Sequence, residues 1–179
     1  MAQNSLQSFA QAVNADWAPL STEVVSAVRH HMETLLKAAP TEAWLHDLHH
    51  KGAPSQELIR DANHGFVLQA HTEQTGLYRP PHDHGRSWVI YAVVKGESVM
   101  GTYGRIVDAS GTVRLVMRDR THVRPGQVQV YLPGDIHDTR CIGGPALLYR
   151  FTERDLKQED SQHHKITRYV ERCGVWVAP

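Results

Sequence analysis

The hydrophobic positions of the first fifty residues recur at spacings of three and four, which is the period of an amphipathic helix. We expect three helices, separated by Pro19 and Pro40 and ending before the Lys51–Ser55 turn. The apolar residues on which these helices are predicted are Leu6, Phe9, Val13, Trp17, Val24, Val25, Val28, Met32, Leu35, Leu36, Trp44, Leu45 and Leu48. Residues 1–52 are therefore predicted to form a helical segment that packs on the rest of the chain, not a separate domain.

From Glu57 onward the pattern changes to short runs of β-branched and aromatic residues separated by Gly, Pro, Asn and Asp, which is typical of strands and tight turns. The predicted strands are Glu57–Arg60, Phe66–His71, Trp88–Val94, Ser98–Tyr103, Val113–Met117, Gln127–Leu132, Ala146–Phe151 and Val175–Val177. Turns are expected at Lys95-Gly96-Glu97 and Gly143-Gly144-Pro145, among other places. Short strands without helices between them indicate an antiparallel sandwich or barrel over residues 53–179.

The charge balance and the apolar content exclude several classes of protein. The 179-residue chain has 19 Lys plus Arg and 19 Asp plus Glu, so a nucleic-acid binder with an overall basic field is not expected. No apolar run is long enough for a membrane span, residues 1–10 lack the pattern of a secretory signal, and two cysteines cannot form a disulfide framework. We expect one soluble cytoplasmic domain with no nucleic-acid or membrane partner, and its oligomeric state stays open.

Two of the 13 histidines, His82 and His84, stand one residue apart after a pair of prolines. Side chains alternate faces in an extended chain, so both imidazoles point the same way and offer two ligands to one metal ion. A Pro-Gly turn before His137 is placed to bring in a third imidazole. Three neutral histidines leave a divalent ion its full charge and open positions for water, O₂ or substrate. A His-x-His pair alone is also common where no metal binds.

The spacing around these histidines resembles the two motifs of the cupin superfamily, whose members are double-stranded β-helix barrels. The residues that match the first motif, G-x5-H-x-H-x3or4-E-x6-G, are Gly76, His82, His84 and Gly96. Val89 stands where the glutamate of that motif would fall, and the second motif, G-x5-P-x-G-x2-H-x3-N, is matched loosely over residues 126–141. The resemblance covers about residues 57–151 and implies an all-β cupin (jelly-roll) barrel with an N-terminal helical preface.

Loss of that glutamate with retention of three histidines looks like the thiol dioxygenases related to cysteine dioxygenase. Those enzymes bind Fe(II) through three histidines and add both atoms of O₂ to a thiol, giving a sulfinate. The resemblance implies Fe(II) at His82, His84 and His137, with O₂ and a small acidic molecule as substrates. It also implies that Arg60 falls near the arginine that binds the substrate carboxylate. Zn or Ni are the alternative metals, because three imidazoles do not encode metal identity.

The chain departs from that family in two places. Val89 stands where mammalian members carry a cysteine cross-linked to a tyrosine, so no such pair is expected here. The family's Ser-x-His-x-Tyr relay aligns with Leu148, Arg150 and Thr152, so all three relay residues are absent. Leu148 and Arg150 share one face of their strand, and we hypothesise that Arg150 points inward as an anion contact that replaces the relay. The alternative is a surface arginine packed along its stem.

Three tyrosines on predicted strands, Tyr91, Tyr103 and Tyr131, are candidates to reach the metal, and the alternative for each is a core role. The leading hypothesis is an Fe(II) dioxygenase acting on a small thiol acid, with Arg60, Arg150 and Tyr91 at the substrate. Three alternatives stay open: cleavage of a diketone or hydroxyketone, a non-redox zinc or nickel cupin, and a small-molecule binding module without catalysis.

Overall fold

The computed structural model describes residues 3–179, apart from the side chains at positions 49 and 51. The three predicted helices are present as α1 (Ser5–Ala15), α2 (Thr22–Leu35) and α3 (Ala43–Lys51). Asn4 and Ser21 cap the first two, because each side-chain oxygen accepts a hydrogen bond from a backbone N–H of the first turn. None of the described helices is long and apolar enough to cross a membrane.

Over the described residues, nine strands follow the helices and form one antiparallel sheet. The strands and the last helix are β1 (Ser55–Arg60), β2 (Val67–Glu73), β3 (Tyr78–His82), β4 (Val89–Val107), β5 (Val113–Val123), β6 (Val128–Tyr131), β7 (Ile136–Thr152), α4 (Leu156–Ser161), β8 (Val170–Arg172) and β9 (Val175–Val177). The sheet has the order β1-β2-β7-β4-β5-β9-β8, with β3 paired to β7 and β6 to β4. The sequence pattern does not predict β3, since its two prolines lack the N–H that a ladder uses.

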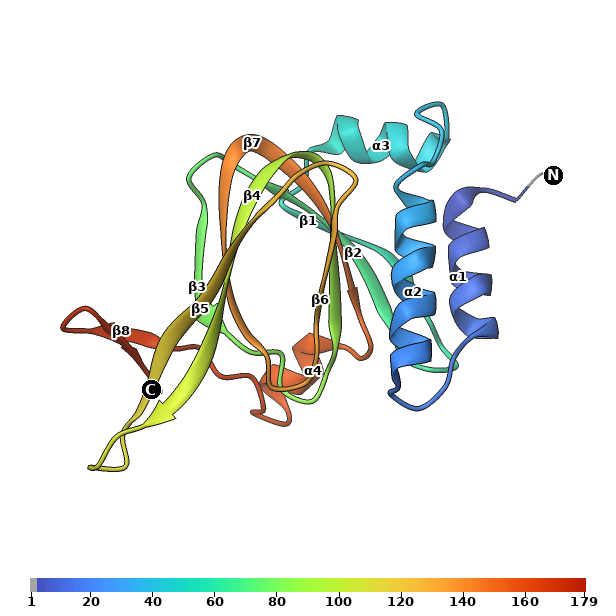
Figure 1. Ribbon diagram of the computed structural model, residues 1–179. Coiled ribbons are helices and arrows are strands. Elements are labelled where there is room, and N and C mark those ends of the chain that lie inside the picture. Colours follow the sequence, from blue (N-terminus) through green and yellow to red (C-terminus); the bar gives the residue numbers. More distant parts are fainter. Residues whose placement is uncertain (1–2) are drawn as a thin grey trace.

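The sheet curls into a half-barrel with the N-terminal helices outside it. Figure 1 shows α1–α3 along one side of the curled strands and α4 near the opposite end from α3. The predicted fold class, mostly antiparallel β with N-terminal helices, is confirmed. This curl matters for function because it creates an interior face onto which side chains from several strands project.

The two longest strands, β4 and β7, run through positions where the sequence predicts turns. Gly96 lies within β4 and Gly143 within β7, so these glycines bend the strands and do not end them. The β4–β7 register shifts at this place, where Glu97 pairs with Gly143. Gly96 has a φ of 75°, and a Cβ there would lie 2.3 Å from the Gly143 carbonyl oxygen. A glycine is required at position 96 by both its backbone conformation and this close approach.

Alternation along β4 divides the buried residues into an outer and an inner cluster. Ile90 and Ala92 pack in the cluster that contains the buried faces of α1 and α2. Tyr91 and Val93 belong to a second cluster inside the half-barrel, together with Leu148 of β7. The helices therefore cover one face of the sheet, and the other face encloses the interior in which the candidate site lies.

Candidate metal centre

Three histidines from two distant parts of the chain meet inside the half-barrel. His82 ends β3, His84 follows in the adjoining turn, and His137 lies near the start of β7. The β3–β7 ladder places His82 directly opposite His137, so both imidazoles project to the same side. One ring nitrogen of each histidine lies within 4.8 Å of the other two, and Nε2 of His84 is 3.3 Å from Nε2 of His137. Strand pairing thus assembles the trio that the spacing predicted.

The environment keeps all three imidazoles neutral, which is the form that binds metals. Burial lowers the pKa of His82, and burial lowers the pKa of His84 and of His137 well below the usual 6.5. Nδ1 of His82 must donate its proton to the Pro80 carbonyl, 2.8 Å away, because a carbonyl can only accept. This bond leaves the lone pair on Nε2 of His82, so the backbone selects the ligating tautomer.

The donor set fits a divalent transition-metal ion. The Nε2 atoms of His84 and His137 lie 3.3 Å apart, at hydrogen-bonding distance, and a metal ion could take both nitrogens as ligands in place of that contact. The Nδ1 atoms of both rings are buried and have no hydrogen-bond partner among the described residues. Three uncharged nitrogen donors suit Fe(II), Zn(II) or Ni(II), and the geometry does not choose among them.

Two of the three candidate tyrosines contact this cluster and the third does not. The Tyr91 hydroxyl is 3.3 Å from Nε2 of His84, and the Tyr131 ring stacks on the His137 ring with centroids 3.9 Å apart. Burial raises the pKa of Tyr91 and of Tyr131, so both stay protonated and able to donate. Tyr103 instead donates to Asp138 at 2.7 Å, in the structural role that was its alternative.

A cavity of about 480 Å³ lies beside His82 and His84 and has Arg150 in its wall. Leu148 and Arg150 both line it, so the strand alternation inferred from the sequence brings both side chains to the interior. Arg150 donates through Nη2 to the Gln69 side chain of β2, and its Nε is buried without a partner. A guanidinium with an unused donor beside this histidine cluster is suited to bind an anion.

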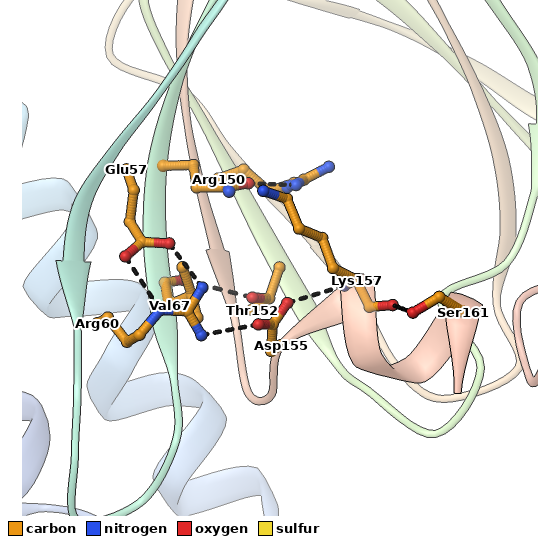
Figure 2. Close-up of polar contacts among 9 residues, drawn as sticks. Glu57, Arg60, Val67, Arg150, Thr152, Asp155, Lys157 and Ser161 are labelled. Atoms are coloured by element: carbon orange, nitrogen blue, oxygen red, sulfur yellow. Dashed lines mark hydrogen bonds and ion pairs between the residues drawn. The ribbon is translucent and has the colours of Figure 1, made fainter. Parts of the chain in front are cut away.

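Arg60, by contrast, is not among the residues that line the cavity, and this part of the prediction is corrected. Its Nη2 lies 2.6 Å from Glu57 and its Nη1 lies 2.7 Å from Asp155, as Figure 2 shows. β1 is an edge strand, so the side chain at its end reaches the surface beside α4 and not the interior. The two carboxylates already engage the guanidinium that was expected to bind substrate.

His71 of β2 is a cavity residue that the sequence did not single out. Burial lowers its pKa to about 3, with Arg150 and Arg79 as further causes, and its Nε2 has no hydrogen-bond partner. It stands opposite Leu148 in the β2–β7 ladder, just as Gln69 stands opposite Arg150. Directly paired residues share a face, so this pairing would have revealed His71, but the sequence does not show which strand is the partner of β2.

The segment after β7 closes one side of the cavity. It contributes Lys157 of α4 and Arg168 to the lining. Buried Glu159 accepts hydrogen bonds from the backbone and side chain of Arg86, at 2.8–2.9 Å, just after the metal-binding turn. Asp83, between the two histidines of the motif, accepts from the backbone of Thr167 at 2.9 Å. These two acids fasten the C-terminal segment to the turn that holds His84.

The chain is similar to several solved structures at low sequence identity. No protein-family model and no curated protein matches it. The structure of KdgF from Halomonas sp. is 16% identical with a TM-score of 0.46, over 58% of this chain and 82% of that one. The Cnp3 cupin domain of Schizosaccharomyces pombe is 12% identical with a TM-score of 0.44, over 61% of this chain and 69% of that one.

A recombinant oxalate oxidase in complex with glycolate is 23% identical with a TM-score of 0.43, over 56% of this chain. The match spans 51%, about half, of the oxalate oxidase chain. All three scores lie below 0.5, so these likenesses carry nothing about activity or ligand. What is known of the site therefore comes from its own residues.

Proposed function

We propose that this protein is a mononuclear non-haem Fe(II) dioxygenase that oxidises a small thiol acid to a sulfinate with O₂. The observation that carries the proposal is the group of three buried imidazoles, two of which, His82 and His84, line the same cavity as Arg150. His82, His84 and His137 would hold the ion through uncharged nitrogens. Fe(II), when bound, supplies the redox chemistry by which O₂ reacts with sulfur. In the overall change a thiol and O₂ give a sulfinate and a proton, with sulfur oxidised and both oxygen atoms reduced.

The protein's own groups bind and orient the substrate. Arg150 binds the carboxylate of the acid, with its unpartnered Nε and the Nη atoms as donors. That contact fixes the position of the carboxylate, so that the thiol end of a substrate of suitable length reaches the histidines. The protonated hydroxyl of Tyr91, next to His84, donates a hydrogen bond to the reacting end. Leu148 and the other apolar lining residues restrict water in the cavity.

Metal analysis followed by oxygen measurements tests the proposal. The protein is purified anaerobically, its metals are quantified by mass spectrometry, and O₂ uptake is followed with a panel of thiol acids and diketones. Iron with thiol-dependent O₂ uptake and a sulfinate product supports the proposal. Zinc or nickel without O₂ uptake contradicts it in favour of a non-redox cupin, and uptake with diketones alone contradicts it in favour of C–C cleavage.

Histidine variants then test which residues hold the metal. We expect His137→Ala to lose nearly all bound metal and all O₂ uptake, because two imidazoles cannot retain the ion against dilution. His122→Ala is the matched control, since His122 lies outside the cavity on β5, where it contacts Glu97. Full metal content in His137→Ala would refute the assignment of the site.

A further inference from the structure

Most charged side chains in the cavity wall are already paired with each other. Arg79 lies 2.9 Å from Glu73, and Arg168 forms two hydrogen bonds of 2.7 and 2.8 Å with Asp160. The remaining acid of the wall, Asp83, is bound by Arg105 at 2.9 Å and by two backbone N–H groups. These acids are therefore engaged, and none is left to balance a further cation.

Two cations of the wall have no carboxylate partner among the described residues. Arg150 contacts the neutral amide of Gln69 and keeps a buried, unpartnered Nε. Lys157 is exposed at the mouth of the cavity, and its ammonium forms no ion pair with any described residue. Figure 2 shows the Lys157 side chain extending from α4 toward Arg150. His71 adds no charge to the cavity wall, because its pKa of about 3 keeps its imidazole neutral.

The cavity thus carries two positive charges that the protein does not neutralise, in addition to any metal charge. Cations that line one cavity repel each other, and a ligand with two anionic groups relieves that repulsion while a monoanion leaves one charge unmatched. A guanidinium binds a carboxylate through two parallel hydrogen bonds, whereas the lysine ammonium is a compact charge at the end of a flexible side chain. The two groups are therefore suited to opposite ends of one short diacid.

We propose that the ligand of this cavity is a dicarboxylic acid, with one carboxylate on Arg150 and the second on Lys157. The inference rests on the proposed function in one respect: the same acid would carry the thiol that approaches His82, His84 and His137. It narrows the substrate class from a thiol monoacid to a thiol diacid. The charge arrangement itself does not depend on what reaction follows.

Calorimetric binding of two probes tests the inference on the full-length protein as purified. Succinate and butanoate have the same number of carbons and differ by one carboxylate. We expect succinate to bind roughly tenfold more tightly than butanoate, the size of one charge-assisted contact. Equal binding of the two probes, or no binding of succinate, would overturn the inference.

Charge-removing variants show which residue each carboxylate uses. Lys157→Met keeps the aliphatic stem and should reduce succinate affinity roughly tenfold while leaving butanoate unchanged. Arg150→Gln should weaken both probes. The matched controls are Lys37→Met and Arg118→Gln, two exposed cations outside the cavity lining, and neither should change the ratio. A succinate preference that survives Lys157→Met overturns the assignment.

Oxygen uptake separates the failure of this inference from failure of the proposed function. If O₂ uptake is equal with a thiol monoacid and a thiol diacid, and the binding preference is absent, the dioxygenase stands and the dicarboxylate site falls. If succinate is preferred and no thiol supports O₂ uptake, the dicarboxylate site stands and the dioxygenase falls. A diacid preference in both measurements supports both.

Discussion

Four histidines of the cavity region are neutral because burial outweighs everything else that acts on them. In His71, His82, His84 and His137 burial is the largest cause of the lowered pKa, and Arg150 adds to it in each. Arg150 disfavours the protonated form of these imidazoles, and its positive charge would also repel a metal cation held by them.

Replacing His71 should change how stability depends on pH. Its folded pKa is about 3 against 6.5 in the unfolded chain, so below pH 6.5 only the unfolded state takes up this proton. Protonation of His71 in the unfolded state therefore lowers the free energy of unfolding progressively as pH falls from 6.5 toward 3. We expect the metal-free His71→Gln variant to lose stability less steeply there, by up to about 1.4 kcal/mol per pH unit.

Urea denaturation of the metal-free protein at a series of pH values between 4 and 7 measures this slope. His122→Gln is the matched control for removal of an imidazole, because it lies on β5 away from the cavity. Identical slopes for wild type and His71→Gln would show that His71 is not buried neutral in solution.

At the scale of elements, α4 is fastened to the turn that carries His84. Glu159 of α4 receives three hydrogen bonds from Arg86, and they lower its pKa to about 2. The stabilisation that this carboxylate contributes is fully present above pH 4.5, the pKa of a glutamate in the unfolded chain. It is lost as the pH falls toward 2, the pKa in the folded protein. Because α4 also carries Lys157, one short helix couples ligand geometry at His84 to the mouth of the cavity.

We expect Glu159→Gln to destabilise the protein by about 2 kcal/mol and to weaken metal binding roughly tenfold. The first effect follows from loss of charge-assisted hydrogen bonds, and the second from a less rigid turn around His84. Denaturation and competition with a chelator measure the two quantities. Glu171→Gln, on the exposed β8, is the matched control. Unchanged metal affinity in Glu159→Gln would mean that the turn holds its shape without α4.

At the scale of the whole molecule, the bend shared by β4 and β7 closes the sheet around the site. The two strands stay paired from Val89 opposite Thr152 to Tyr103 opposite Ile136, through the irregular register at Gly96. The bend allows the β7 segment that carries His137 and the β7 segment that carries Arg150 to face one interior. Without it the two halves of β7 would continue as one extended strand, and Arg150 would lie far from His137.

Gly96→Ala should therefore be much more damaging than an alanine at an ordinary turn glycine. Gly96 and Gly111 both have positive φ, at 75° and 82°, but only at position 96 would a Cβ meet backbone, 2.3 Å from the Gly143 oxygen. We expect Gly111→Ala to cost about 1 kcal/mol and Gly96→Ala about 3 kcal/mol or more. Chemical denaturation measures both, and equal costs would show that the close approach is unimportant.

The sequence by itself determined the features that depend on neighbours along the chain. Helical and strand periodicities are local, so the three helices and most strands were predictable, although two bends were interpreted as turns. The histidine trio followed from motif spacing, and the inward direction of Arg150 followed from its sharing a strand face with Leu148.

Only the tertiary structure decided which distant segments lie together. It placed Arg60 beside Asp155 at the surface, brought His71 opposite Leu148, and laid Lys157 at the mouth of the cavity. Each of these positions depends on strand pairing or on the return of the chain after β7. Such contacts join residues far apart in sequence, and no local pattern of hydrophobic and polar positions specifies them.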